Sequence, residues 1–299
     1  MVPPRWTRYA AGAPLVIVAV VAALYAAGWI RQAHRGPRNI PFKLTPGEHL
    51  EYAVAAWFGT GTIIVDVSPL LTLDNGTPAC RIVYTLKPDE AVSAGYLIKG
   101  QLSMILDAAT LLPIEYEERL TTGLGFMGGH VKHKKLVYDR TNNTVLYYKS
   151  KNGDELQYSR KRSIPPNTHH LASMPYYFRV AAMKPGDVVS VDISDRKRDL
   201  TIRADVLREE PYAAPDGSTR AALVLKTVTD FGREDAGNTE FVASLDKEER
   251  FLVRLDAKTR WGTISAQLVK RDIARSASAD ANEDSRNHPG QIPIDTVAR

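Results

Sequence analysis

The sequence has a single cysteine, Cys80, so no disulfide bond can form within the chain. A lone cysteine in the apolar run CRIVYTL is typical of a small packed hydrophobe rather than of a nucleophile. Gly-x-Ser-x-Gly, His-Glu-x-x-His, the phosphate-binding loop and the dinucleotide-binding glycine pattern are all absent. We therefore predict no enzyme, no catalytic residue and no cofactor. A hydrolase triad assembled from distant residues is the alternative that sequence patterns leave open.

An excess of charge of one sign is found in only one region of the sequence. The net charge is +5 over 299 residues, but residues 130–162 contain nine Lys or Arg and three Asp or Glu. Two interpretations of this basic region are open: a solvated sheet face, or a surface that meets anionic lipid head groups, glycans or acidic proteins. Nucleic acid is not expected as a partner, because the region lacks the interleaved aromatics of a single-strand platform.

Long hydrophobic runs are limited to one, which predicts a membrane anchor. Residues 9–30 carry no charged side chain and follow Arg5 and Arg8. As a helix they would span about 33 Å, enough for the hydrocarbon core of a bilayer. Trp29 and Tyr25 stand near its end as interface aromatics. We predict an uncleaved, single-pass membrane helix with a linker at 31–41. The positive charges on its two sides marginally favour a cytoplasmic body, since Arg31, Arg35, Arg38 and Lys43 follow the helix and Arg5 and Arg8 precede it.

Beyond the linker, period-two alternation and turn residues predict a mostly-β domain over residues 42–272. GEHLEYAVAAW alternates apolar and polar residues, and Asp74-Asn75-Gly76 supplies turn chemistry between two strands. Many short strands separated by Gly, Asn, Asp or Pro favour an antiparallel sheet. One internal helix is predicted over residues 168–183, with Thr168 as its N-cap and Pro175 as a kink or second start. Residues 273–299 lack apolar periodicity and are predicted to be a disordered tail.

The pair His130-x-x-His133 raises the question of a metal site. The segment HVKHKKLVYDR leads into the turn residues TNNT and then VLYYK, which is the pattern of a β-hairpin. In a strand, positions 130 and 133 point to opposite faces, so the two imidazoles cannot share one ion. We predict sheet here and no metal site.

Several segments in a fixed order resemble a bacterial envelope family of unknown function, the one numbered 3108. They are GEHLEYAVAAWFGTG, LDAATLLPIEYEERL, HKKLVYDR, LASMPYYFRV, KPGD and RLDAKTRWGTISAQLVK. The resemblance implies an exported domain, and on this ground we prefer residues 1–8 in the cytoplasm, the helix in the inner membrane and the bulk of the chain in the periplasm. It also implies a strongly curved antiparallel sheet wrapped around one central helix, similar in shape to outer-membrane lipoprotein carriers. It supplies no catalytic residue. This sequence departs from many members at Thr168-His169-His170, where an Asp-rich turn is common.

Two groups of residues are candidate ligand contacts in such a fold. Aromatic side chains near the strands would line an apolar cavity, or else fill the core; they are Trp57, Phe58, Tyr96, Phe126 and Phe178. Basic residues would meet phosphates at its mouth; they are Lys132, Lys134, Arg160 and Arg162. The function predicted is non-catalytic binding of a lipid, lipidated or anionic envelope component. The alternative is a scaffold that contacts the cell wall or a protein partner; the oligomeric state is left open.

Overall fold

The computed structural model describes residues 44–57, 59–89, 96–124, 129–150, 153, 155–194, 199–229, 239–259 and 262–273. In this part of the chain strands dominate, which confirms the mostly-β prediction. The elements in chain order are β1 (Glu48–Ala56), β2 (Gly59–Val67), β3 (Leu71–Thr72), β4 (Pro78–Pro88), β5 (Tyr96–Asp107), β6 (Pro113–Leu124), β7 (His130–Asp139), β8 (Thr144–Lys149), β9 (Gln157–Ser163), the 3-10 turn η4 (Leu171–Ser173), α3 (Met174–Val180), β10 (Val188–Ser194), β11 (Asp199–Ala213), β12 (Thr219–Thr229), β13 (Thr239–Asp246), β14 (Leu252–Thr259) and β15 (Gly262–Ile273).

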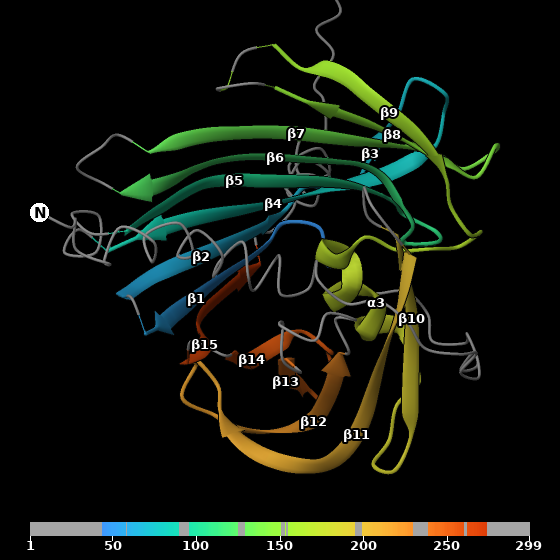
Figure 1. Cartoon of the computed structure of the whole chain (residues 1–299). Helices are drawn as coiled ribbons and strands as arrows, with labels where there is room; N and C mark the ends of the chain where they lie inside the picture. Colours follow the sequence, from blue (N-terminus) through green and yellow to red (C-terminus); the bar gives the residue numbers. More distant parts are fainter. Residues whose placement is uncertain are drawn as a thin grey trace, which may run out of the picture.

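All these strands form one antiparallel sheet, as predicted. Its order is β10-β11-β12-β13-β14-β15-β1-β2-β4-β5-β6-β7-β8-β9, with β3 paired to β4. Neighbours in the sheet are nearly all neighbours in the sequence, so short turns are enough to build it. Two pairings are exceptions: β2 pairs with β4 across the short β3, and β1 pairs with β15, which joins the two halves of the sheet. In Figure 1 the strands from β2 to β9 arch over the top, β10 to β14 curve below, and η4 and α3 lie between them.

The alternation in the sequence sets which side of the sheet faces the helical segment. In β1, Leu50, Tyr52 and Val54 are buried while Ala53 and Ala55 are exposed. Apolar residues at every second position therefore give the sheet an inner face that packs on η4 and α3. The predicted turn at Asn75-Gly76 is confirmed, because Gly76 has φ +82° and its N–H donates to Leu73 O at 2.8 Å.

A glycine in β5 permits a close approach between two strands. Gly100 has φ +141°, and a Cβ at this position would lie 2.1 Å from the carbonyl oxygen of Arg119 on β6. Only glycine tolerates both the backbone angle and this contact. Glycines of this kind in strand interiors mark kinks in curved sheets.

The helical segment is shorter than predicted. Instead of one helix over 168–183, a 3-10 turn at Leu171–Ser173 precedes an α-helix at Met174–Val180. The prediction that Thr168 is the N-cap is wrong: its hydroxyl donates to Pro165 O at 3.1 Å. His170 caps η4, because its Nδ1 accepts the Ala172 N–H at 3.1 Å. Pro175 falls in the first turn of α3, where its missing N–H costs nothing, as the second-start prediction required.

The helical segment packs on both halves of the sheet. Ala172 and Tyr176 belong to the largest core cluster, which extends over the inner faces of the strands from β1 to β8. Phe178 and Met183 belong to a second cluster with side chains of β10 to β13. The helical segment therefore contacts both halves of the sheet, and this packing is the main source of stabilisation for so short a helix.

The two ends of the sheet differ. At the β10 end the backbone of His169 pairs with the strand: its N–H donates to Asp192 O at 2.7 Å and its carbonyl accepts from Ser194 N at 2.8 Å. At the β9 end the described residues supply no further strand. The sheet is not closed, since β9 and β10 are its two ends and do not pair with each other.

Within the ranges that the structure describes, no helix is long and apolar enough to cross a bilayer. The predicted membrane segment 9–30, the linker 31–41 and residues 274–299 of the predicted tail lie outside those ranges.

Candidate ligand-binding face

The predicted basic residues share the inner face of the sheet. Directly opposite residues of antiparallel strands project to the same side, and Lys132 lies opposite Leu120, which is 1% exposed. By the same argument Arg160 lies opposite the buried Tyr147, and Arg162 lies opposite the buried Val145. Lys134 lies opposite the buried Glu118 on one side and opposite Lys149 on the other. We call this set the inner basic face; its members are Lys132, Lys134, Lys149, Arg160 and Arg162. Lys149 was not among the ligand contacts predicted from the sequence, although the period-two alternation of TVLYYK places it on the same face as Val145 and Tyr147.

Lys134 is held by a buried carboxylate. Its Nζ donates to Glu118 Oε1 at 2.5 Å, and Glu118 Oε2 accepts the hydroxyl of Tyr116 at 3.1 Å. The Glu118 side chain is 3% exposed and that of Lys134 is 20% exposed. A carboxylate this deep needs a cation and further donors to offset its lost hydration. The primary role of Lys134 is therefore to neutralise the buried Glu118 carboxylate.

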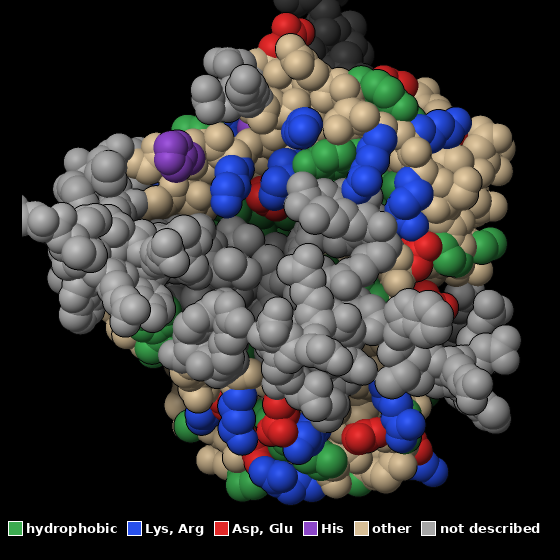
Figure 2. Space-filling view, in the orientation of Figure 1, with side chains coloured by type: hydrophobic (Ala, Val, Ile, Leu, Met, Phe, Trp, Pro, Cys, Tyr) green, Lys and Arg blue, Asp and Glu red, His purple; other side chains and the backbone are tan. Residues whose placement is uncertain are grey.

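The two arginines of β9 make different contacts. Arg162 Nη1 lies 2.8 Å from Asp199 Oδ2, so an ion pair bridges β9 and the start of β11. The guanidinium of Arg160 lies 5.8 Å from the centroid of the Tyr147 ring, within cation–π range. Two carboxylates, Glu118 and Asp199, are paired with cations of the inner basic face. Figure 2 shows Lys and Arg side chains side by side over the upper strands.

Polarity changes across the inner face, from apolar at the middle strands to cationic at β7–β9. One ladder of opposite residues makes this plain; in order from β4 to β9 it is Ile82, Met104, Tyr116, Leu136, Tyr147 and Arg160. The adjacent inner-face ladder runs from Tyr84 through Leu102 and Glu118 to Lys134 and Lys149, so its buried carboxylate already faces a lysine. The ladder beyond that one runs through Leu86, Gly100 and Leu120 to Lys132. The inner surface is therefore amphipathic across its strands, with the cations on the side of the β9 edge.

Of the five aromatic candidates, the structure describes the side chains of two, Trp57 and Phe178. Phe178 is 4% exposed and packs in the core cluster of α3 with β10–β13, so it fills the core. Trp57, directly after β1, is 50% exposed. Tyr96 begins β5, but its side chain, like all of Phe58 and Phe126, falls outside what the structure describes.

The two histidines of β7 lie on opposite faces, which confirms the strand interpretation of that segment. His130 is opposite Thr122, an inner-face residue, whereas His133 is opposite the exposed Arg119. On the outer face His133 Nε2 lies 2.7 Å from Glu117 Oε1. Among the described residues no three His, Cys, Asp or Glu side chains are grouped as metal ligands would be.

A buried histidine beside the inner face was not anticipated as a packing residue. The His170 ring stacks on Tyr116 with centroids 3.9 Å apart, and it is 0% exposed. Burial, with Lys134 nearby, lowers the pKa of His170 to about 3, so the imidazole is neutral at physiological pH. The dipeptide His169-His170 at the start of the predicted helix was the signal available in the sequence.

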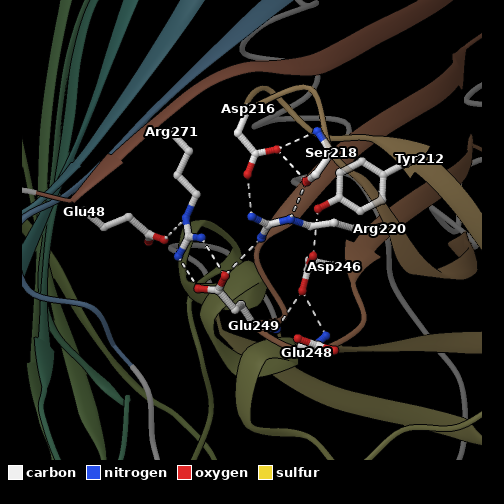
Figure 3. Close-up of polar contacts among 9 residues, drawn as sticks. All are labelled: Glu48, Tyr212, Asp216, Ser218, Arg220, Asp246, Glu248, Glu249 and Arg271. Atoms are coloured by element: carbon white, nitrogen blue, oxygen red, sulfur yellow. Dashed lines mark hydrogen bonds and ion pairs between the residues drawn. The ribbon is translucent and has the colours of Figure 1, made fainter.

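A second polar cluster lies at the junction of the two sheet halves and is built of mutually satisfied charges. Figure 3 shows Arg271 between Glu48 and Glu249, with Arg220 next in the chain of contacts. Arg271 Nη1 and Nη2 lie 2.8 and 2.5 Å from the two Glu249 oxygens, and its Nε lies 3.1 Å from Glu48. Arg220 continues to Asp216 at 2.7 Å. Since acids and bases alternate here, this cluster joins strands rather than offering charge to a ligand.

The family model described as "Protein of unknown function (DUF3108)" matches residues 50–269, well over half of the chain. The chain belongs to the DUF3108 family. No curated protein matches this DUF3108 member. It is similar to a solved beta-barrel-like protein of domain of unknown function DUF1849 from Brucella abortus, with a TM-score of 0.47 and 11% sequence identity. That similarity covers 78% of this chain and 99% of the other.

Proposed function

We propose that this DUF3108 member is a membrane-anchored periplasmic protein that binds, without catalysis, an anionic lipid or lipid-linked component of the bacterial envelope. The observation that carries the proposal is the amphipathic inner face, on which apolar ladders end in the cations of β7–β9. A phosphate-bearing head group would meet cations of β7–β9, and its apolar part would lie toward Leu120 and the strands beyond.

The membrane anchor is supported by the uncharged run of residues 9–30. A tethered protein stays at the membrane surface, where lipids and lipid-linked molecules are concentrated. The anchor therefore suits an acceptor or holder of such a molecule better than a shuttle that must cross the periplasm.

The clustering of positive charge supports an anionic ligand. Lys134 and Arg162 have carboxylate partners in Glu118 and Asp199. Lys132, Lys149 and Arg160 add three further cations to the same face. Lysine and arginine are natural partners of phosphate, arginine through paired N–H groups and lysine as a point charge.

The test uses the full-length chain in phosphatidylcholine nanodiscs, titrated with short-chain phosphatidylglycerol and, as the zwitterionic reference, short-chain phosphatidylcholine. Calorimetry should detect tighter binding of the anionic lipid. The double variant Lys132→Gln with Arg160→Gln should weaken that binding roughly tenfold or more, because the inner basic face loses two of its five cations.

The matched control is Lys135→Gln with Lys161→Gln. Lys135 and Lys161 lie on β7 and β9, the same strands as Lys132 and Arg160, but their registers place them on the outer face. The two control substitutions remove the same amount of charge as the test pair. The control should bind phosphatidylglycerol as the parent does. Equal losses in both double variants, or equal binding of the two lipids by the parent, would contradict the proposal.

A further inference from the structure

β9 is the last strand at one end of the sheet that the structure describes, and β10 is the last strand at the other end. β10, at the far end of the strand order, is covered by the backbone of His169 through two hydrogen bonds. No described residue pairs with the outer edge of β9 (Gln157–Ser163). Sheet edges left in this state are templates for another strand, and proteins ordinarily cover them or blunt them with charge.

The charge on β9 favours a particular partner. Arg160, Lys161 and Arg162 are consecutive, and the strand contains no carboxylate. Because successive residues alternate between faces, an added strand would meet cations on both of its sides: Arg160 and Arg162 on the inner face and Lys161 on the outer face. A second copy of the same basic strand would be repelled, whereas an acidic strand would be attracted on both faces.

The outer face of β9 also offers an apolar contact. Tyr158 is 60% exposed, and its ring stands edge-on to Tyr148 of β8 with centroids 5.9 Å apart. An aromatic side chain of this exposure on the last described strand can pack against a β-branched residue of an incoming strand. Six of the seven β9 residues are exposed, so the strand is accessible along its length.

We propose that β9 is a docking edge for an extended, acid-rich segment of a partner protein, which adds to the sheet as a further strand. Main-chain hydrogen bonds to the β9 edge supply affinity, and carboxylates at consecutive positions select the partner. This role goes beyond ligand binding on the inner face, because it uses the backbone of β9 and the outer-face Lys161.

The first test is binding of a fluorescent peptide, Thr-Val-Thr-Glu-Asp-Glu-Thr-Val-Thr, to the full-length chain in phosphatidylcholine nanodiscs. Two derivatives carry N-methyl groups on alternate amides, in one parity or the other. Strand addition requires that one parity abolish binding while the other binds as the parent peptide, because only alternate amides face β9. Hydrogen exchange should show slowed amides in residues 157–163 on binding.

Lys161→Glu should weaken binding roughly tenfold, because an attractive cross-strand pair becomes repulsive. Lys99→Glu is the matched control, since Lys99 is an exposed lysine on β5, away from the edge, and should leave peptide affinity unchanged.

Three results would overturn the proposal. Equal binding of both methylated peptides, or binding without protection of β9, would show a charged surface rather than strand addition. Tighter binding of a peptide copying residues 276–285 would assign the edge to the chain's own tail instead of a partner.

Discussion

Arg179 Nη1 lies 2.7 Å from Glu48 Oε2, and the two side chains are 6% and 0% exposed. This ion pair joins α3 to the first strand of the sheet. The other Glu48 oxygen lies 3.1 Å from Arg271 Nε on β15, so one buried carboxylate is shared by two guanidinium groups. The helix is therefore held at the β1–β15 junction by charge as well as by its apolar contacts.

Glu48→Gln should destabilise the domain by about 3–5 kcal/mol, because two buried guanidinium groups would lose their common counter-charge. Urea unfolding followed by circular dichroism measures the loss. Glu51→Gln is the control on the same strand, since Glu51 is partly exposed and pairs with Lys270 on the outer face. A loss no larger in Glu48→Gln than in this control would show that the buried pair contributes little.

Gly100→Ala should prevent or severely weaken pairing of β5 with β6. The added Cβ would lie 2.1 Å from Arg119 O, at a φ of +141° that alanine rarely adopts. Gly76→Ala is the matched control, because Gly76 also has a positive φ, +82°, but an alanine Cβ there would have no atom within 4 Å. Its expected cost is about 1 kcal/mol, from backbone strain alone. Thermal unfolding of both variants checks the difference, and equal melting temperatures would contradict the steric explanation.

Stability should fall as the pH is lowered below 6.5, in part because of His170. Burial lowers its pKa from 6.5 to about 3, so between these values the unfolded chain binds a proton that the folded chain does not. Stability then rises with pH across that window and is lost on acidification. His49 contributes with the opposite sign: hydrogen bonds with Glu51 and Asp66 raise its pKa, and its stabilisation is lost as the pH rises.

The measurement is urea unfolding of His170→Asn and the parent between pH 4 and pH 7. Asparagine keeps a side-chain oxygen to accept the Ala172 N–H, so the cap of η4 is retained. The variant should show a flatter dependence on pH than the parent. Parallel curves would mean that His170 does not contribute to the acid sensitivity.

The mostly-β antiparallel fold was accessible from the sequence because buried strands alternate visibly, as in GEHLEYAVAAW and HKKLVYDR. β9 has a weaker signal, because QYSRKRS is an edge strand with exposed residues on both faces and has no apolar period. The helix was overextended because THH reads as a helix start, whereas the His169 backbone pairs with β10. Glu48 could not be recognised as buried, since its two arginine partners are 131 or more positions away in the sequence.

The sequence predicted part of the inner basic face, but not the buried partner of one of its lysines. Alternation along β7 placed Lys132 and Lys134 on one side, as the registers bear out. The sequence does not reveal that Glu118, on the neighbouring strand, is buried beside Lys134. That contact depends on the register of β6 with β7, which turn lengths and core packing determine together.

The pair Lys134–Glu118 should be strongly coupled, and a double-mutant cycle tests this. Glu118→Gln alone leaves a poorly solvated ammonium group without its counter-charge and should cost about 3 kcal/mol. In Glu118→Gln with Lys134→Met no charge remains unpaired, so the loss should be well below the sum of the two single losses.

The neighbouring pair Lys135–Glu115 joins the same two strands at 2.8 Å on the outer face, with side chains 29% and 28% exposed. The corresponding cycle there should give a coupling of about 0–1 kcal/mol, because water screens the charges. Equal coupling energies in the two cycles would show that the inner face at Lys134 is as well solvated as the outer face. Strong coupling on the inner face alone would assign Lys134 to the stability of the domain and leave Lys132 and Arg160 as the residues to test for anion binding.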